Sequence, residues 1–321
     1  MKIAILHGDV AKDAGADELD TFAQAAFAAD GLTRLGHDPF CIPVSLNLES
    51  LREELIRAKP AVVFNLVESL AGRGNLIHVV PALLDALGIP YTGARTEAMF
   101  VSSNKLLAKQ RLAEAGLPTA PWLTVADGSD DAFTPGKWIV KSVWEHASVG
   151  LDEDSVIAAA DKGALAEEMV RRKQSLGGAC FAEKFIDGRE FNVSLLAGCV
   201  LPPAEILFDG YPAGKVRVVG YRAKWEETSF EYAATRRSFD FSHGDEPLLE
   251  RLVQLSRQCW RLFGLRGYAR VDFRVDDAGA PWILEVNANP CLSPDAGFPA
   301  AAARAHLSFP DVLQRIIDDA L

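Results

Sequence analysis

Four polar side chains near the C-terminus have the types and spacing of a metal-binding site: Arg270, Asp272, Glu285 and Asn287. They stand in two largely apolar segments, residues 268–275 and 282–287, joined across Asp-Ala-Gly at 277–279, which predicts a β-hairpin. Because side chains two positions apart share one face of a strand, each strand should direct both of its polar side chains to the same side.

Carboxylate and amide oxygens of this kind suit Mg2+, which keeps phosphate oxygens and waters as its other ligands. The alternative is a hairpin with an ordinary solvated outer face. Glu285 and Asn287 argue against that alternative because they stand within Ile-Leu-Glu-Val-Asn, where burial is expected and an unpaired carboxylate is unfavourable. Arg270 supplies the counter-ion that a buried cluster of charges needs. A metal–phosphate site is therefore favoured.

The segments Arg-Val-Asp-Phe (270–273) and Leu-Glu-Val-Asn-Ala-Asn-Pro (284–290) resemble the metal-binding hairpin of the ATP-grasp superfamily, and most of all its D-alanine–D-alanine ligase branch. Enzymes of that branch activate a carboxylate with ATP as an acyl phosphate and then join it to an amine. The resemblance implies that Arg270 and the backbone N–H of Cys291 stabilise the tetrahedral oxyanion. It also implies one or two Mg2+ ions, with Mn2+ as the alternative, held by Asp272, Glu285 and Asn287.

The resemblance extends to the segments that bind the nucleotide. Residues 183–191, Glu-Lys-Phe-Ile-Asp-Gly-Arg-Glu-Phe, are similar to the family's adenine hinge, and residues 142–150 are similar to its phosphate lid. The residues that the resemblance makes catalytic are Arg270, Lys224 and Ser148. The implied nucleotide contacts are Lys105, Lys141, Glu183, Lys184, Phe185, Ile186, Glu190 and Lys224.

The positions that select the substrate depart from the family. The N-terminal Glu-Arg-Glu-Val-Ser stretch is absent, and the lid has His146 and Ala147 in place of Gly-Ser. A family tyrosine is Trp225 here, and the Ser-Leu that holds the second substrate's carboxylate reads Ala296-Gly297. The sequence therefore favours an ATP-dependent carboxylate–amine ligase whose substrate is an amino acid or small acid other than D-alanine.

Two alternatives to that interpretation remain. One is D-alanine–D-alanine ligase itself, with rearranged residues around the substrates. The other belongs to another class: an ATP-binding module without turnover, which the complete metal-binding triad disfavours.

A loop near the N-terminus is a further candidate for binding substrate. It follows the apolar segment 61–65, at the strand end where open α/β sheets bind ligands. A solvated loop explains its charged residues equally well. Glu68 and Arg73 are the residues of this loop that are expected to contact the substrates. Elsewhere in the chain, the expected substrate contacts are Trp225, Cys291 and Ser293.

An α/β scaffold must position these side chains. Within residues 1–94, strands are predicted at 2–6, 39–44, 61–65 and 89–92, and helices at 19–35, 48–58 and 76–87. The alternation predicts a Rossmann-like parallel sheet, although the first turn lacks G-x-G-x-x-G and does not indicate a dinucleotide. The resemblance implies an ATP-grasp fold, in which two α+β domains follow and clamp ATP. The expected domains are 1–94, 95–184 (the lid) and 185–321.

The later part of the chain has its own predicted elements. They are a helix at 103–116 with its N-cap within 102–104, a strand at 138–141, a helix at 153–173, two strands within 180–191 separated by a turn at 187–188, antiparallel strands at 191–197 and 200–207, an irregular stretch at 209–239, and helices at 247–263 and 312–317.

Composition limits the class of protein further. The formal net charge of -11 argues against a non-specific nucleic-acid partner or an anionic membrane. The five cysteines are scattered, no signal peptide precedes the first strand, and no apolar run reaches membrane-spanning length, so a cytoplasmic protein with reduced thiols is expected. The expected partners are small-molecule carboxylates and amines, and a homodimer is expected because ligases of this branch are often dimers.

Overall fold

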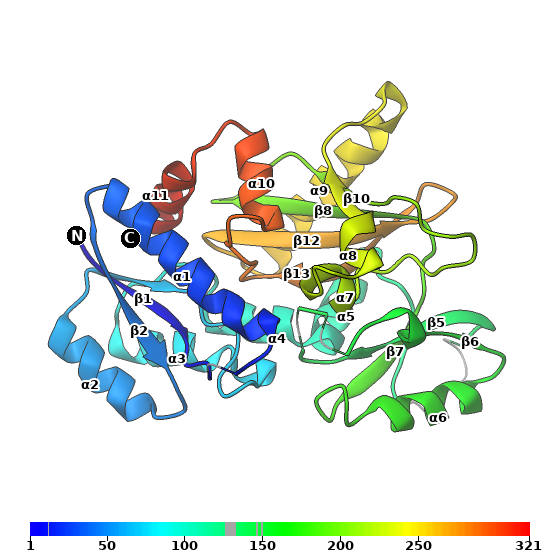
Figure 1. Cartoon of the computed structure of the whole chain (residues 1–321), viewed down its shortest axis with the longest axis horizontal. Helices are drawn as coiled ribbons and strands as arrows, with labels where there is room; N and C mark the ends of the chain where they lie inside the picture. Colours follow the sequence, from blue (N-terminus) through cyan, green and yellow to red (C-terminus); the bar gives the residue numbers. More distant parts are fainter. Residues whose placement is uncertain (12, 126–132, 146, 149) are drawn as a thin grey trace.

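The computed structural model describes residues 1–321 except 12, 126–132, 146 and 149. The described strands form three sheets, of three, six and four strands. Figure 1 shows the three-stranded sheet at one end of the molecule, the four-stranded sheet at the other, and the six-stranded sheet between and above them. None of the described helices is long and apolar enough to cross a membrane.

The three-stranded sheet is parallel, in the order β2-β1-β3. Alternate residues of β1 serve two cores: Ile3 and Ile5 pack with α1, whereas Ala4 and Leu6 pack with α2 and α3. The central strand is therefore apolar on both faces. The elements of this N-terminal unit, the three-stranded sheet with its helices, are β1 (Lys2–Gly8), α1 (Ala16–Arg34), β2 (Asp38–Val44), α2 (Leu48–Ala58), β3 (Val62–Asn65), η1 (Gly74–Leu76) and α3 (Val79–Leu87).

Most of the predicted alternation in this unit is confirmed, with two differences. The strand predicted at 89–92 is reduced to one bridge between Val63 and Tyr91. The helix predicted from residue 76 begins at Val79, after the single 3-10 turn η1.

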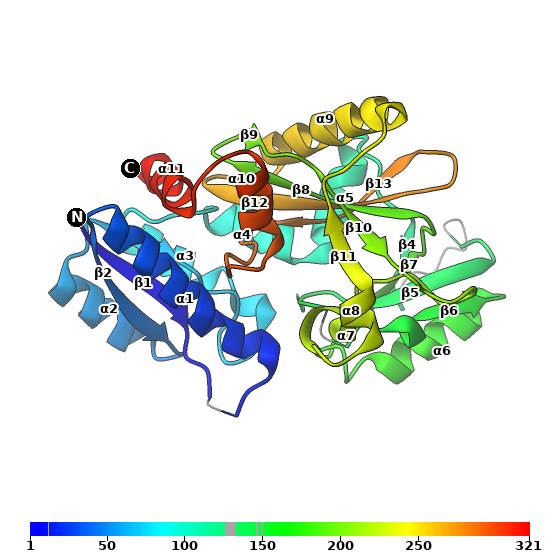
Figure 2. The same cartoon turned by 45° about the horizontal axis from the view of Figure 1, so that its top comes forward.

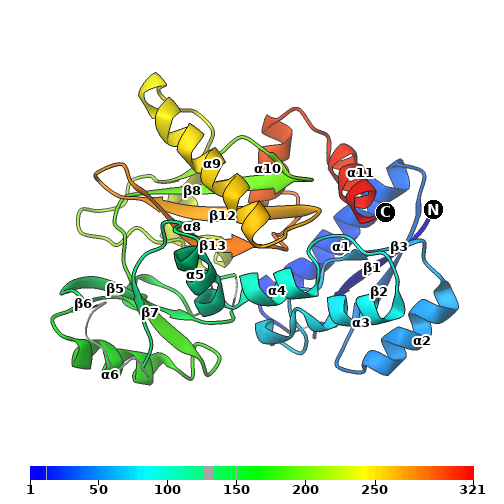
Figure 3. The same cartoon turned by 180° about the vertical axis from the view of Figure 1, so that it is seen from behind.

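The last helix of the chain returns to the first sheet. Five buried side chains of α11 (Phe309–Ala320) share a core with β1 and α1, and Phe309 stacks on Phe27 with ring centroids 3.9 Å apart. Figures 1 and 3 both show α11 beside α1, with the two chain ends close together. The domain ranges 1–94, 95–184 and 185–321 stay a proposal, to which the structure adds that α11 packs on the first unit.

The four-stranded sheet is antiparallel, in the order β4-β7-β5-β6. The helix predicted at 153–173 is wrong at its start, because Val156 and Ile157 lie on strand β6. The helix begins only after Asp161, whose side chain caps it by accepting a hydrogen bond from the backbone N–H of Ala164. The elements are β4 (Trp122–Leu123), β5 (Gly136–Ser142), η2 (Glu153–Ser155), β6 (Val156–Ala159), α6 (Lys162–Arg172) and β7 (Cys180–Lys184).

The six-stranded sheet has the order β11-β10-β8-β12-β13, with β9 paired to β8. One face packs under α4, α5 and α9 through a large apolar core. Figure 2 shows α9 along one side of this sheet, and Figure 3 shows it crossing in front of β8 and β12. The elements are α4 (Thr96–Ser103), α5 (Lys105–Glu114), β8 (Arg189–Leu196), β9 (Cys199–Val200), β10 (Ala204–Phe208), β11 (Thr235–Ser238), η3 (His243–Asp245), α9 (Glu246–Leu262), β12 (Tyr268–Val275), β13 (Pro281–Asn287) and α10 (Gly297–Arg304).

Two further details differ from the predictions. The stretch 209–239 is not wholly irregular, because it contains α7 (Tyr221–Trp225), α8 (Phe230–Ala234) and β11. The turn predicted at 187–188 carries the chain from one sheet to another, since β7 and β8 belong to different sheets. Gly188 has φ +142°, and a Cβ there would overlap the carbonyl oxygen of Val275.

Candidate active site

A cavity of about 680 Å3 is lined by residues from three parts of the molecule. These are α1 with the loop after β3, the four-stranded sheet, and the six-stranded sheet. It brings together most of the residues singled out from the sequence, including those of the hairpin, the lid and the adenine hinge. Two of them do not line it: Arg73 is exposed, and the side chain of Lys184 donates to the carbonyl oxygens of Thr134 and Pro135. The predicted residues that line it are Glu68, Lys105, Lys141, Ser148, Glu183, Phe185, Ile186, Glu190, Lys224, Trp225, Arg270, Asp272, Glu285, Asn287, Cys291 and Ser293.

The hairpin has the geometry expected from its alternation. Strands β12 and β13 place Arg270 opposite Asn287 and Asp272 opposite Glu285, with a bulge directly after Asp272. Arg270 donates to both oxygens of Asp272, from Nε at 2.7 Å and from Nη2 at 2.8 Å. Asn192 of β8, which the sequence analysis missed, donates to the same carboxylate at 2.8 Å. The buried carboxylate is therefore held rigidly at the cavity wall.

Electrostatics set this pair apart from a surface ion pair. Burial raises the pKa of Asp272, the charge of Arg270 opposes that rise, and the neighbouring carboxylate of Glu285 adds to it. Burial alone would lower the pKa of Arg270, but the charge of Asp272 raises it above its ordinary value. The carboxylates of Asp272 and Glu285 are two like charges side by side, and this arrangement favours a cation between them.

The donor set of the hairpin fits Mg2+. It offers two carboxylates and the amide oxygen of Asn287, which is oriented by accepting from the backbone N–H of Asn289 at 3.0 Å. Hard oxygen donors of this kind suit Mg2+ better than softer metals. Among the described residues, no group of three or more His, Cys, Asp or Glu side chains is placed to hold a metal.

Three lysines line the part of the cavity next to the hairpin. Lys105 opens α5 after the Asn104 cap and donates to the carbonyl oxygen of Glu145 at 2.6 Å. Burial lowers the pKa of Lys105 and of Lys224. Lys141 is the penultimate residue of β5, and its ammonium lies 3.1 Å from the carboxylate of Glu183. Desolvated ammonium groups gathered in one cavity suit a polyphosphate.

Glu183 has partners that the sequence analysis did not predict. Its carboxylate lies between Lys141 and Lys109, the latter at 2.8 Å, and both Lys109 and Glu183 are 1% exposed. Burial alone would raise the pKa of Glu183, but the two lysine charges lower it. Lys109 follows Lys105 by one helical turn, which is the sequence signal that could have found it. Contact of Glu183 with a nucleotide stays a prediction.

Glu190 also has a buried partner that was missed. Arg274 pairs with Glu190 at 2.9 Å and donates to the carbonyl oxygens of Gly188 and Arg217. These contacts fix the hinge segment between β7 and β8 against the central sheet. Binding of a ribose by Glu190 stays a prediction.

The described part of the predicted lid contacts α7 and the segment before it. Ser148 donates to the carbonyl oxygen of Val219 at 2.8 Å, and the indole N–H of Trp225 donates to that of Ala147 at 2.9 Å. Residues 146 and 149 of the lid, including His146, lie outside the described residues. Tyr221 donates to Asp17 of α1 at 3.0 Å, so α7 also contacts the N-terminal unit.

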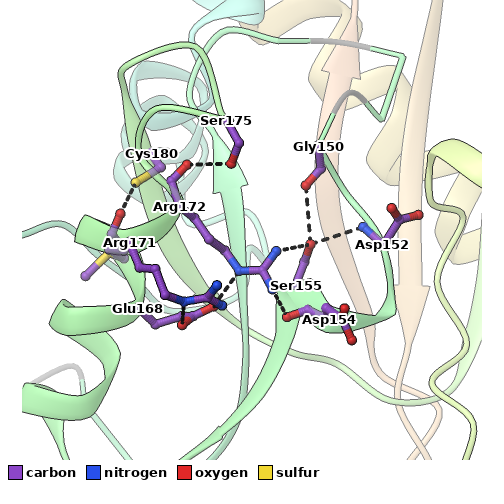
Figure 4. A network of polar contacts seen from close by, with 10 residues as sticks. Gly150, Asp152, Asp154, Ser155, Glu168, Arg171, Arg172, Ser175 and Cys180 are labelled. Atoms are coloured by element: carbon purple, nitrogen blue, oxygen red, sulfur yellow. Dashed lines mark hydrogen bonds and ion pairs between the residues drawn. The ribbon is translucent and has the colours of Figure 1, made fainter.

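Arg172 of α6 is linked to the end of the lid loop through hydrogen bonds of Ser155 (Figure 4). Its Nη1 donates to Ser155 Oγ at 3.2 Å, and its Nε donates to Glu168 at 2.5 Å. Ser155 Oγ accepts from the backbone N–H of Asp152 at 3.1 Å and donates to the carbonyl oxygen of Gly150 at 3.4 Å. This network ties the end of the lid loop, at Gly150, to α6 through Ser155.

A polar cluster from α1, the loop after β3 and the loop after β13 forms another wall of the cavity. Gln24 donates to Glu68 at 2.9 Å and to Asp20 at 3.2 Å. Asp20 also accepts from Ser293 at 2.6 Å and from the thiol of Cys291 at 3.1 Å. Burial raises the pKa of the Cys291 thiol well above its ordinary value, so the thiol acts as a hydrogen-bond donor. The predicted substrate residues Glu68, Cys291 and Ser293 therefore do meet, with Asp20 and Gln24 added.

Glu68 should make stability depend on pH. Burial raises its pKa to about 7, although the hydrogen bond from Gln24 opposes the rise. Because the folded chain holds this proton more tightly than the unfolded chain, the carboxyl stabilises the fold at low pH, and the contribution is lost as the pH rises through about 7.

We expect Glu68→Gln to raise the melting temperature at about pH 8.5 by a few degrees relative to wild type, or roughly 1 kcal/mol. At about pH 5.5 the difference between the two proteins should be much smaller. Thermal unfolding of both proteins at the two pH values measures this. The same difference at both values would contradict the assignment.

Comparisons with known proteins agree with this geometry. A family model described as the D-ala D-ala ligase C-terminus matches residues 112–318. The D-alanine–D-alanine ligase of Moorella thermoacetica is 30% identical, with 100% of this chain and 99% of that protein covered. The enzyme of the same name from Aquifex aeolicus is also 30% identical, with 90% and 91% covered.

Solved structures show the same fold. The crystal structure of D-alanine–D-alanine ligase from Bacillus anthracis complexed with ATP matches with a TM-score of 0.74 over 100% of this chain and 97% of that chain. Its sequence identity is 22%, so this match concerns the fold alone.

Proposed function

This chain belongs to the D-alanine–D-alanine ligase branch of the ATP-grasp superfamily, an enzyme family that forms C–N bonds, and from that premise we propose that it joins two molecules of D-alanine at the expense of ATP. The predicted ATP-grasp fold is confirmed by the structural matches. The sequence analysis favoured a substrate other than D-alanine. The curated relatives support the D-alanine alternative better, since ligases of that name match along nearly the whole chain.

One observation carries the proposal: the Arg270–Asp272 pair faces Glu285 across the hairpin, in a cavity lined by three lysines. We propose that Lys105, Lys141 and Lys224 hold the phosphates of ATP. Asp272, Glu285 and Asn287 would hold one or two Mg2+ ions, which neutralise phosphate charge when bound, and Mn2+ is the alternative.

The proposed chemistry has two steps. The carboxylate of the first D-alanine takes the γ-phosphoryl group of ATP, which gives an acyl phosphate and ADP. The amine of the second D-alanine attacks the acyl carbon, and inorganic phosphate leaves with formation of the peptide bond. We propose that Arg270 stabilises the oxyanion of the tetrahedral intermediate.

The test is a reaction of purified protein with ATP, MgCl2 and D-alanine, followed by ADP release and by mass spectrometry of the product. The expected result is one D-alanyl-D-alanine for each ADP, with L-alanine giving little of either. ADP release with other amino acids but none with D-alanine would overturn the proposal.

A ligase for another amino acid or small acid is the second candidate. The substitutions at Ala147, Trp225 and Ala296-Gly297 favour it, as does the cluster of Asp20 and Glu68 on the cavity wall. The same assay with a panel of amino acids separates the two candidates. A homodimer and a cytoplasmic location stay predictions, and light scattering of the purified protein tests the first of them.

A further inference from the structure

Arg237 has an environment unlike that of the other arginines in the cavity. It lies on β11 and lines the cavity together with Arg270. Its guanidinium lies against the start of α10: a Cβ on Gly297 would be 3.6 Å from its Nε and from its Nη2. Arg237 therefore occupies the space beside Gly297 where a longer residue 297 would place its side chain.

The hydrogen-bonding capacity of Arg237 is largely unused. Its Nε is buried without a partner, and its Nη1 makes only a 3.4 Å contact with the carbonyl oxygen of Asp295. In the part of the chain that the structure describes, Arg237 has no carboxylate partner within ion-pair distance, whereas Arg236, Arg270 and Arg274 each have one. Burial lowers the pKa of Arg237 and the positive charge of Arg270 lowers it further, whereas the charge of Asp295, which lies beyond ion-pair distance, opposes that fall. Arg237 is half-buried, and a charge withdrawn from water in this way normally has a counter-ion.

The start of α10 adds a second source of positive potential. The helix has no side-chain cap at Ala296, so the backbone N–H groups of its first turn have no side-chain acceptor from that residue. Such N–H groups and the helix dipole favour an anion. A carboxylate placed there would also be in reach of the guanidinium fork beside Gly297.

We propose that Arg237 binds the carboxylate of the amine substrate, and so takes over the role that the Ser-Leu pair has in the resembling ligases, where this chain has Ala296 and Gly297. The inference rests on the proposed ligase function. A guanidinium recognises a carboxylate through charge and two parallel hydrogen bonds, whereas a hydroxyl offers a single neutral one. The amine substrate must therefore carry a full negative charge next to its amine, and a neutral amide in its place should be rejected.

Hydroxylamine separates this role from the rest of the reaction. It attacks an acyl phosphate without needing a carboxylate of its own, so hydroxamate formation from D-alanine and ATP reports only the first step. Dipeptide formation reports both steps. The measured quantity is the ratio of the dipeptide rate to the hydroxamate rate at subsaturating D-alanine, for wild type, Arg237→Gln, Arg237→Lys and Arg236→Gln.

Arg237→Gln should lower this ratio about 30-fold, through a higher KM for the second D-alanine, as expected for loss of a charge-assisted pair. Arg237→Lys should recover part of the ratio because the charge returns without the fork. Arg236→Gln is the matched control, since it removes the same charge from the neighbouring residue, which is paired with Asp209 at 2.9 Å. Its ratio should stay close to that of wild type.

Two outcomes would overturn the inference. One is a fall of both rates by the same factor in Arg237→Gln. The other is ligation of D-alaninamide as acceptor by wild type as efficiently as D-alanine. If wild type forms no hydroxamate from D-alanine, the proposed function fails by itself. D-alanine should then still raise the melting temperature of wild type more than that of Arg237→Gln, and an equal shift in both proteins would refute the anion site.

Discussion

Replacing Asp272 by Asn should abolish ligation, with kcat lowered about 1,000-fold, because the substitution removes a charge worth several kcal/mol to the transition state. Asp272 is the centre of the site: it accepts both hydrogen bonds of Arg270 and one from Asn192, and it lies opposite Glu285. The amide of Asn is nearly isosteric, but it has one oxygen in place of two and cannot neutralise Arg270. The change should therefore affect both the proposed cation site and the position of the guanidinium.

The matched control is Asp277→Asn, at the exposed tip of the same hairpin. It removes a carboxylate from the same element without touching the cavity, and kcat should stay within about twofold of wild type. Circular dichroism should show both variants folded. A second measurement, titration of the dependence on MgCl2, should show that Asp272→Asn needs far more metal. Near-normal turnover by Asp272→Asn would exclude the proposed metal-binding role.

The largest effect on stability is expected at Lys109. Lys109→Met leaves the buried carboxylate of Glu183 with Lys141 as its remaining ion-pair partner, and it also removes the 2.7 Å hydrogen bond to Thr119. Removing one member of a buried ion pair typically costs about 3–5 kcal/mol, because the other charge stays desolvated. For a chain of this size, that corresponds to a fall in the melting temperature of roughly 6 °C or more.

Lys137→Met provides the comparison. Lys137 pairs with Asp187 at 3.0 Å, but these side chains are 54% and 55% exposed, so the pair should contribute under about 1 kcal/mol. The double variant Lys109→Met/Glu183→Gln should recover part of the stability lost in Lys109→Met, because the fully buried carboxylate is then gone, and Lys141, which also loses its partner, is 15% exposed. Equal melting temperatures for Lys109→Met and Lys137→Met would show that burial of the first pair has no energetic consequence.

Local sequence pattern was sufficient to predict the geometry of the hairpin. Arg270 and Asp272 are two residues apart on a strand, and so are Glu285 and Asn287, so strand periodicity alone places each pair on one face. The same holds for the parallel sheet, because the apolar run of β1 supplies two cores through alternate residues. Short-range rules were insufficient at residues 153–159, where Val156 and Ile157 suit a helix and a strand equally, and the cap at Asp161 decides where the helix starts.

The sequence by itself therefore determined that Arg270, Asp272, Glu285 and Asn287 lie together on one hairpin, and it determined the order of the first strands and helices, because those features depend on residues close together in the chain. Only the tertiary structure decided which distant residues complete the site. Lys109 meets Glu183, Asn192 meets Asp272, and Arg237 lies against Gly297, across 60 to 80 positions of sequence. Such contacts depend on the path of the chain between three sheets, and no periodicity of a single strand or helix specifies that path.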